Sequence, residues 1–378
     1  MHTSDVAIVG GGLIGLSIAF ELARRGSTVR VYDIAQPGRG ASWAGAGLLA
    51  PYSERPVPAL LDACERSLRA YPAFAAAVAA ESGVDPRLHV SGIVHAATSD
   101  DELRDLEREA IGLRASGVEA TSLDRAAALA AEPALSSGVR GGLLIPVEGS
   151  VDNRRLGRAL IAACRARGVR IVEGASIAIR CDARRALGVA TDDGFAAAGA
   201  IVNAAGAWAA GVAGVPDDCL PPVRPVKGQM LAIEVPHGFV RRPVWTPQAY
   251  LVPRDDGRLL VGATVEERGF DERVTAGGLA QLLHAALRAA PSLTSFTVSE
   301  QWAGLRPATP DGLPYVGRTA LDGLFTAAGH YRNGILLAPL TATAIADAIE
   351  GRSDVLPAFS PLRGPVDRME SHAAGANR

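Results

Sequence analysis

The sequence predicts a mixed α/β (α+β) fold, with one domain of alternating strands and helices and a second domain built on an antiparallel sheet. Three stretches carry this prediction. Residues 5–33 have the pattern of a strand, a glycine-rich turn, a helix and a second strand, and residues 200–205 form another apolar strand ending in a turn of small residues. Residues 225–233, 249–253 and 259–263 instead alternate as strands, with Asp255-Asp256-Gly257 as a hairpin turn.

The first of these stretches predicts a dinucleotide-binding turn. Gly10, Gly12 and Gly15 have the Gly-x-Gly-x-x-Gly spacing between a strand and a helix. These glycines permit a tight turn, approach of a pyrophosphate to the backbone, and close packing of helix on strand. Asp33, at the end of the second strand, is placed to accept hydrogen bonds from ribose hydroxyls. The alternative is an ordinary tight turn between a strand and a helix, because the glycine spacing alone is weak.

The region after Asp33 predicts a lining for a flat ligand. Residues 37–51 are rich in glycine and alanine, which allow the backbone to run close to such a ligand, and Ser42 is placed to contact a phosphate. A flexible linker is the alternative.

Composition excludes several function classes. The chain has 378 residues, a formal net charge of −2 and 48% hydrophobic residues, so a nucleic-acid partner has no electrostatic support. No run of about 18 apolar residues is present, and no integral membrane segment is expected. The four cysteines and seven histidines lack the spacing of metal ligands, and no metal is expected. With no secretory signal pattern and with cysteines expected to be reduced core thiols, we predict a cytoplasmic protein.

The remaining elements follow from periodicity and from turn residues. Helices are expected over residues 57–82 with a break at Pro72, and over residues 100–116, 124–131, 151–167 (with Asp152 and Asn153 as cap candidates), 275–290 and 334–350. Short strands are expected over residues 88–97, 141–146, 169–172 and 176–180, and the chain from residue 300 to this last helix is expected to be rich in loops. Lys227 is interpreted as a surface or strand-edge residue, with a contact to the site as the alternative.

These elements predict two discontinuous domains. Residues 1–85, 145–218 and 300–364 would form the nucleotide-binding domain, and residues 86–144 and 219–299 the substrate-binding domain. Residues 365–378 are polar, and we expect a disordered tail there.

Together with the first fingerprint, several further motifs resemble the D-amino acid oxidase superfamily, and within it the glycine oxidases of thiamine biosynthesis. They occur in the family's order over nearly the whole chain. They are Ser-Trp-Ala-Gly-Ala-Gly-Leu-Leu at 42–49, Val-Lys-Gly-Gln at 226–229, Tyr-Leu-Val-Pro-Arg at 250–254, Val-Gly-Ala-Thr at 261–264, Trp-Ala-Gly-Leu-Arg-Pro at 302–307, Asp-Gly-Leu-Pro-Tyr-Val-Gly at 311–317 and Gly-His-Tyr-Arg-Asn-Gly-Ile-Leu-Leu-Ala-Pro at 329–339.

The resemblance implies a glutathione-reductase-type FAD-binding domain with Rossmann-like topology, beside an antiparallel-sheet substrate domain. It implies non-covalent FAD and oxidation of glycine or other small amino acids or amines by hydride transfer. The products would be an imine, then an oxo acid and ammonia, with molecular oxygen as the acceptor and hydrogen peroxide as its product. A homo-oligomer is possible. The alternative is an FAD-dependent dehydrogenase of D-amino acids or hydroxyproline that uses another acceptor.

The resemblance also assigns residues. Arg332 corresponds to the carboxylate-binding arginine, Arg306 to a second active-site arginine and Tyr250 to the substrate-side tyrosine. Gln248 stands where glycine oxidases often carry histidine, and Val265 replaces a methionine of the family. The residues expected to contact the cofactor are Gly10, Gly12, Leu13, Ile14, Gly15, Asp33, Ile34, Ala41, Ser42, Ala46, Gly47, Leu48, Ile177, Gly206, His330, Tyr331, Asn333, Gly334, Ile335 and Leu336.

Each assignment has a structural alternative. Arg332 could form a structural ion pair, Arg306 could support the site without touching the substrate, and Tyr250 could be a core aromatic residue. His330 could be a packing residue or a support for the flavin. An NAD-dependent dehydrogenase or a non-catalytic nucleotide-binding module is the competing class of protein. Against it, residues 329–339 resemble a segment that closes over a flavin ring.

Overall fold

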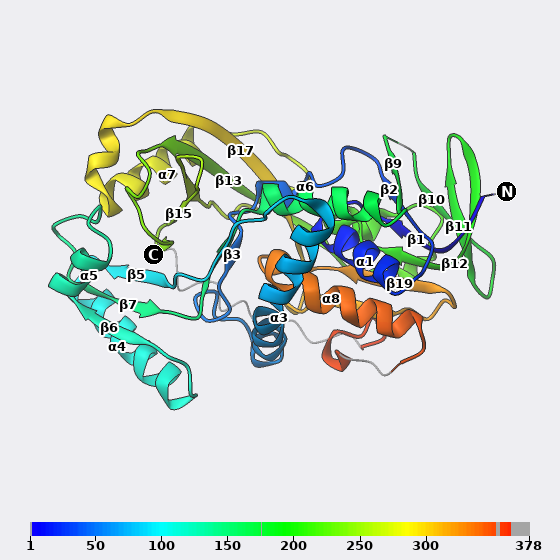
Figure 1. Ribbon diagram of the computed structural model, residues 1–378, viewed down its shortest axis with the longest axis horizontal. Coiled ribbons are helices and arrows are strands. Elements are labelled where there is room, and N and C mark those ends of the chain that lie inside the picture. Colours follow the sequence, from blue (N-terminus) through cyan, green and yellow to red (C-terminus); the bar gives the residue numbers. More distant parts are fainter. Residues whose placement is uncertain (1, 175, 353–355, 364–378) are drawn as a thin grey trace.

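Two eight-stranded sheets form the structure, a computed structural model that describes residues 2–174, 176–352 and 356–363. They lie towards opposite ends of an elongated molecule, as Figure 1 shows. The first sheet, with the N-terminus, is on the right of that view, and the second is on the left. The long strands β13 (Arg224–Glu234) and β17 (Val298–Ala308) extend from the second sheet towards the first.

The first sheet has a parallel centre, as the sequence predicts. Its strands are β1 (His2–Val9), β2 (Val29–Asp33), β9 (Arg170–Glu173), β10 (Ala178–Cys181), β11 (Ala186–Thr191), β12 (Gly194–Asn203), β18 (Tyr315–Arg318) and β19 (Leu324–Ala328). The order β19-β12-β1-β2-β9 is parallel throughout, and β10, β11 and β18 add antiparallel pairs. Strand β12 lies directly beside β1, so the turn of small residues after β12 is next to the glycine-rich turn after β1.

Four helices pack together over the first sheet and bury its main core: α1 (Leu13–Arg24), α3 (Pro58–Ser82), α6 (Asn153–Ala166) and α8 (Gly334–Ile349). The predicted break at Pro72 is wrong, because α3 continues through it. Proline removes one backbone hydrogen bond from a helix interior. The fully buried Tyr71 and Val78 on the inner face of α3 offset that loss through packing.

The second sheet is mostly antiparallel and runs β17-β13-β16-β15-β14-β5-β7-β6. Its other strands are β5 (Ile93–Ala97), β6 (Thr121–Asp124), β7 (Gly141–Ile145), β14 (Val244–Trp245), β15 (Tyr250–Pro253) and β16 (Arg258–Gly262), and its helices are α4 (Asp100–Ala115), α5 (Arg125–Ala131) and α7 (Ala276–Ala289). Side chains alternate between its faces. Leu231 and Val261 join the core with α7, whereas Met230 and Leu260 face residues 43–48.

Short elements connect the two sheets. Strands β3 (Leu48–Leu49), β8 (Gly149–Val151) and β4 (Leu88–His89) form a small third sheet, and α2 (Ala41–Ala44) precedes it. The 3₁₀ helices are η1 (Gly206–Gly211), η2 (Asp217–Cys219), η3 (Pro291–Ser295) and η4 (Pro357–Phe359).

Two sequence interpretations are corrected. The chain after residue 300 does not begin as a loop, because β17 pairs with β13 along its length in the second sheet. Lys227 is not on the surface: its side chain is 1% exposed, and its Nζ lies 3.9 Å from carboxylate oxygens of Glu266 and Asp271. The domain ranges remain a prediction. The predicted disordered tail lies outside the described residues.

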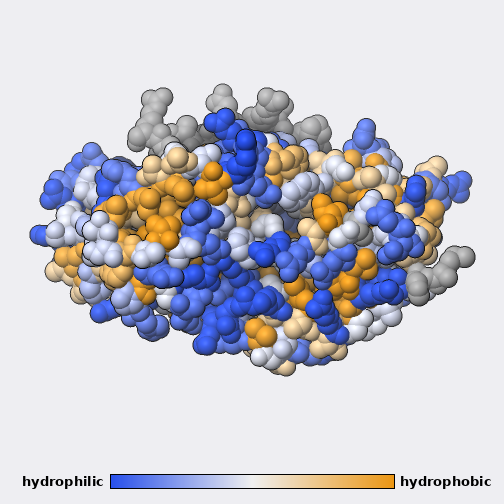
Figure 2. All heavy atoms as spheres, turned by 90° about the horizontal axis from the view of Figure 1, so that it is seen from above, coloured by the Kyte–Doolittle hydropathy of each residue, from blue (hydrophilic) through white to orange (hydrophobic). Residues whose placement is uncertain are grey.

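The visible surface mixes polar and apolar residues. Figure 2 shows hydrophobic patches on both halves of the face seen from above, separated by hydrophilic side chains. Within the described residues, no helix combines the length and the apolar character that a membrane crossing requires.

The close packing of β1, α1 and β12 yields a stability prediction. A Cβ atom at Gly15 would lie 1.9 Å from the carbonyl oxygen of Gly10, so Gly15→Ala must push α1 away from β1. We expect a loss of at least about 2 kcal/mol in the free energy of unfolding, as overpacked sites show. Denaturant unfolding measures it.

Gly112→Ala is the matched control. Gly112 lies inside α4, and nothing stands within 4 Å of the added Cβ. This change should raise stability by about 0.5–1 kcal/mol, because alanine favours helices over glycine. Equal effects of the two substitutions would contradict the packing argument.

Candidate active site

The turn after β1 is built from backbone contacts that only glycine permits. Gly10 has a φ of 110°, and a Cβ there would lie 2.3 Å from the carbonyl oxygen of Ala204. Helix α1 then starts at Leu13 without a side-chain cap from Gly12. The N-terminal end of α1 therefore faces the space outside the carboxyl ends of the parallel strands, where anionic groups bind in such sheets.

Two side chains organise this turn. Asp33 Oδ2 accepts a hydrogen bond of 2.6 Å from the Gly11 N–H, and its Oδ1 accepts one from the Ala35 N–H. Ser42 Oγ accepts a hydrogen bond of 2.9 Å from the Leu13 N–H. Ser42 thus lies at the start of α1, where the sequence places a contact to phosphate, and Asp33 lies at the edge where ribose is expected.

The region 37–51 lines the cavity and is fixed by hydrogen bonds, so it is not a flexible linker. Three side chains bind carbonyl groups of this segment: Asn153 Nδ2 donates to the Ser42 carbonyl at 2.8 Å, Trp302 Nε1 to the Ala44 carbonyl at 2.9 Å, and Arg254 Nη2 to the Ala46 carbonyl at 2.7 Å. Because Asn153 comes from α6, Trp302 from β17 and Arg254 from the hairpin turn directly after β15, the lining is fixed between the two sheets.

The segment 329–333 closes the opposite side. Tyr331 has a φ of 46°, and its N–H donates to the Pro307 carbonyl at 2.9 Å. His330 is buried, and its Nε2 lies 3.0 Å from Thr341 Oγ1 of α8. Burial lowers the pKa of His330 to about 3, so the imidazole is neutral at ordinary pH. This favours the interpretation of His330 as a packing residue, and Asn333 ends the turn one residue before α8.

Arg306 is held by backbone carbonyls. Its Nη1 donates to the carbonyl of Lys227 at 3.2 Å and to that of Thr264 at 3.1 Å. The absence of a side chain at Gly228 makes room for this guanidinium, since a Cβ there would lie 2.3–2.5 Å from its atoms. The orientation of Arg306 is therefore fixed before any ligand binds.

Tyr250 lies beside Arg306 on the second sheet. A Cβ at Gly262, its partner on β16, would lie 2.6–2.7 Å from the phenol ring, so glycine again makes the space. The Tyr250 hydroxyl is 3.8 Å from Met230 Sδ. Burial raises the pKa of Tyr250 while Arg306 lowers it, with a net rise, and the phenol remains protonated as a hydrogen-bond donor.

Arg332 forms an ion pair with Glu54, a partner that the sequence does not reveal. Its Nη1 lies 3.2 Å from Glu54 Oε2, and these side chains are 35% and 13% exposed. Burial alone would lower the pKa of Arg332, but Glu54 and Tyr331 raise it above its usual value. The guanidinium has five donors, of which Glu54 engages Nη1. The ion-pair alternative is thus observed, and the pair lies on the cavity wall.

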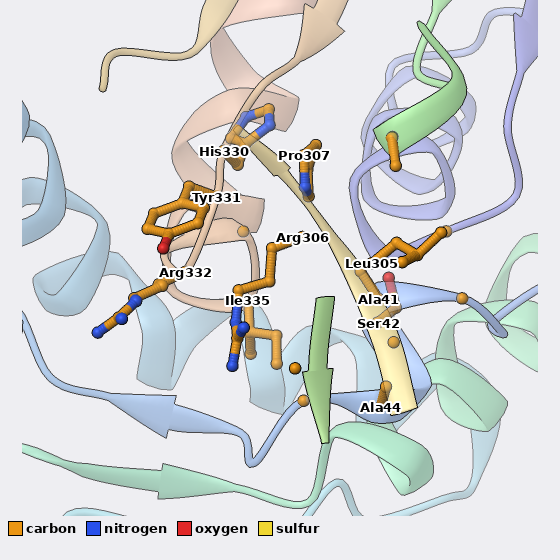
Figure 3. A pocket seen from close by; sticks show the side chains of 18 of the residues that line it. Ala41, Ser42, Ala44, Leu305, Arg306, Pro307, His330, Tyr331, Arg332 and Ile335 are labelled. Atoms are coloured by element: carbon orange, nitrogen blue, oxygen red, sulfur yellow. The ribbon is translucent and has the colours of Figure 1, made fainter. Parts of the chain in front are cut away.

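One cavity of about 740 Å³ connects these parts. Figure 3 shows Arg306 and Arg332 on one side of it, and Ala41, Ser42 and Ala44 on the other. Of the residues predicted to act on substrate or cofactor, all line the cavity except Gly15 and Leu336. Gly15 acts through packing against Gly10, and Leu336 is buried in the core, where its carbonyl accepts a bond from Ser67 Oγ.

Sequence reasoning missed several lining residues, among them Glu54, Trp245, Thr246 and Met230. Met230 could have been found from strand alternation, because it lies two positions after Gly228. Glu54 had no recognisable signal, since it is a single acidic residue in a turn. Among the described residues, no group of three or more histidine, cysteine, aspartate or glutamate side chains could hold a metal ion.

The cavity suits a dinucleotide with a flat ring. Its glycine-lined turn, the N-terminal end of α1 and Asp33 match the needs of a pyrophosphate and a ribose. The small residues 44–47 provide a surface without bulky side chains, and a Cβ at Gly45 would lie only 2.9 Å from Ile335 Cδ1. The residues present therefore fit FAD.

Comparison with known proteins agrees with this geometry. Residues 5–348 match the family model described as FAD dependent oxidoreductase (DAO). The glycine oxidase of Geobacillus kaustophilus is 39% identical over 92% of this chain and 93% of its own length. The crystal structure of glycine oxidase from that organism superposes with a TM-score of 0.91 and covers 97% of this chain and 100% of that one.

A bifunctional protein ThiO/ThiG of Synechocystis is 38% identical over 96% of this chain. The chain spans 54% of the length of that relative. On the family match over most of its length, and on a cavity that fits the cofactor, the chain belongs to the DAO family of FAD-dependent oxidoreductases.

Proposed function

We propose that this protein is an FAD-dependent oxidase of glycine or other small amino acids or amines. The observation that carries the proposal is the shared cavity, which has a dinucleotide-binding turn at one side and Arg306, Arg332 and Tyr250 at the other. The glycine oxidases among its relatives support the same reaction. Trp245 and Tyr250 occupy the substrate side with large rings, which favours a small substrate.

Three residues would bind the substrate. Arg306 and Arg332 would donate charge-assisted hydrogen bonds to the α-carboxylate, and the Tyr250 hydroxyl would donate a further one. Carbonyl groups hold Arg306, and Glu54 holds Arg332, so both guanidiniums are pre-organised. This would fix the Cα–H of the substrate relative to the cofactor, which is the positioning that hydride transfer needs.

The cofactor would be held without a covalent bond. Gly10, Gly12, Leu13 and Ser42 would contact the pyrophosphate, and Asp33 the adenosine ribose. When bound, FAD supplies the hydride acceptor and the later transfer of electrons to molecular oxygen. The N-terminal end of α8, after Asn333, would stabilise negative charge near the ring. The other cofactor contacts predicted from sequence remain proposals at the positions described above.

The remaining parts of the proposal are the products and the setting. We expect an imine that hydrolyses to an oxo acid and ammonia, with hydrogen peroxide released. A cytoplasmic location, a homo-oligomeric state and a place in thiamine biosynthesis stay predictions. Gln248 and Val265 both line the cavity, so they are positions at which substrate preference could differ from that of the glycine oxidases.

An oxygen-consumption screen tests the function. With glycine, sarcosine, D-alanine, D-proline and larger D-amino acids as substrates, we expect the fastest turnover with the small ones, with one peroxide formed for each oxygen used. Turnover with an artificial dye but without peroxide in air would select the dehydrogenase alternative. A flavin-containing protein that turns over none of these compounds with either acceptor would contradict the proposal.

The space at Gly228 gives a sharper test. Gly228→Ala places a methyl group where the Arg306 guanidinium lies, and displacement of that group should reduce kcat/KM for the best substrate by about 100-fold. FAD binding, followed by visible absorbance, should be unchanged. Gly277→Ala is the control, because nothing lies within 4 Å of its added Cβ, and it should leave kcat/KM as it is. If the Gly228→Ala variant kept the wild-type kcat/KM, Arg306 would not be a substrate-binding residue.

The role of Arg332 is tested by Arg332→Lys and Arg332→Met. Loss of a charge-assisted hydrogen bond costs about 1.5–3 kcal/mol, so the methionine variant should raise KM roughly 10- to 100-fold. The lysine variant keeps the charge but loses the planar guanidinium with its paired donors. Its KM should lie between those of the wild type and the methionine variant. Steady-state kinetics with glycine measure both. A KM that stays at the wild-type value in both variants would leave Arg332 with only its ion pair to Glu54.

A further inference from the structure

A buried polar cluster lies behind the substrate side of the cavity. It consists of Ser53, His95 and Glu148, whose exposed fractions are 7%, 4% and 0%. Ser53 comes from the turn before α3, His95 from β5, and Glu148 from the turn between β7 and β8. None of the three side chains lines the cavity. Burying such polar groups is costly unless each is hydrogen-bonded, and here each is.

Glu148 fixes the turn that carries Glu54. Its Oε1 accepts hydrogen bonds from the N–H groups of Tyr52, at 2.7 Å, and Ser53, at 2.9 Å. Its Oε2 accepts a hydrogen bond from Ser53 Oγ. The next residue along the chain is Glu54, whose carboxylate holds Arg332. The three hydrogen bonds to Glu148 therefore fix the backbone directly before the residue that binds Arg332.

His95 connects the same hydroxyl to the other wall. Its Nε2 lies 2.7 Å from Ser53 Oγ. Its ring stacks on that of Trp245, with ring centroids 5.9 Å apart and an angle of 17° between the ring planes. The ring centroids of Trp245 and Tyr250 are 5.6 Å apart. The strand register explains this row, because His95 is paired with Trp245, and Trp245 with Tyr250, across β5, β14 and β15.

The cluster is not a hydrolytic triad. In such a triad the imidazole lies between the hydroxyl and the carboxylate, whereas here Ser53 lies between His95 and Glu148. Burial also lowers the pKa of His95 to about 3. A neutral imidazole has one donor and one acceptor nitrogen, so when Ser53 donates to Glu148 its Oγ accepts from Nε2–H of His95. The cluster then forms one directed chain of hydrogen bonds.

We propose that Ser53, His95 and Glu148 are positioning residues that hold the Glu54–Arg332 wall and the Trp245–Tyr250 wall at a fixed separation. The proposal rests on the proposed function, since it assigns these two walls to the substrate. A single hydroxyl joins them: Ser53 Oγ bonds the carboxylate that fixes one wall and the imidazole that supports the other. A carboxylate ligand bound between Arg332 and Tyr250 should therefore be sensitive to Ser53, although Ser53 does not line the cavity.

The experiment compares Ser53→Ala and Glu148→Gln with Thr319→Val in the FAD-loaded enzyme. Thr319 is the matched control, because it is a buried hydroxyl whose hydrogen bonds go to the carbonyls of Leu321 and Leu324 and to the Leu321 N–H, and none of these three residues lines the cavity. Three quantities are measured for each protein: the Tm, the Kd of acetate from the change in flavin absorbance, and KM and kcat for glycine.

We expect all three variants to lose thermal stability. Only Ser53→Ala and Glu148→Gln should weaken acetate binding, by about tenfold for Ser53→Ala and less for Glu148→Gln, which keeps one acceptor oxygen. KM for glycine should rise in parallel, with kcat changed less than KM. If Ser53→Ala does not fold, the isosteric Glu148→Gln decides the question alone.

Two results would overturn the inference. One is a Kd for acetate and a KM for glycine that stay at wild-type values in the Ser53 and Glu148 variants, which would make the cluster purely structural. The other is loss of FAD with unchanged ligand binding once FAD is restored. If the wild type binds acetate but oxidises no amino acid, the proposed function fails while the acetate Kd still decides the positioning role. If the wild type oxidises glycine but binds no acetate, KM for glycine alone decides the positioning role, and if it neither binds acetate nor oxidises an amino acid, both proposals fail.

Discussion

Close backbone contact at positions without side chains is the constraint on which the structure depends. At Gly10 and Gly15 it brings β1, α1 and the turn after β12 together, which opens the end of the parallel sheet to a dinucleotide. At Gly228 and Gly262 it opens space in the second sheet for the Arg306 guanidinium and the Tyr250 ring. The same device thus shapes both the cofactor side and the substrate side of one cavity.

The cofactor side and the substrate side keep a fixed relative position because the segment 37–51, which lies between them, is hydrogen-bonded to both parts of the structure. Its carbonyl groups accept hydrogen bonds from Asn153 on α6, from Trp302 on β17 and from Arg254 in the hairpin turn after β15. Arg154 strengthens the junction, since its guanidinium lies 3.6 Å from the Trp43 ring centre and 2.8 Å from Glu300. A flat ring placed against this lining would meet the substrate at a geometry set by the protein alone.

Much of this arrangement could be predicted from the sequence, because local patterns carry it. The strand–turn–helix at residues 5–33 and the hairpin at Asp255-Asp256-Gly257 follow from turn chemistry and periodicity, and both are confirmed. The motifs that resemble the family located the cavity residues, and the family itself is confirmed.

What the sequence did not reveal depends on contacts between distant segments. Pro72 stays inside a helix because the core behind it compensates, and Lys227 is buried because Glu266 and Asp271 lie near it. The partner of Arg332 is Glu54, which is 278 positions away. Strand β17 (Val298–Ala308) could not be predicted because its sequence contains Gly304 and Pro307, which disfavour strands. Its pairing with the distant β13 stabilises it.

The central claim is that FAD and an amino acid meet in this cavity, and anaerobic reduction of the purified protein tests it most directly. We expect the visible flavin absorbance to be lost on addition of glycine or another small amino acid without oxygen, and to return when air is admitted. A flavin spectrum that does not respond to any small amino acid, or a protein that binds no flavin at all, would contradict the account.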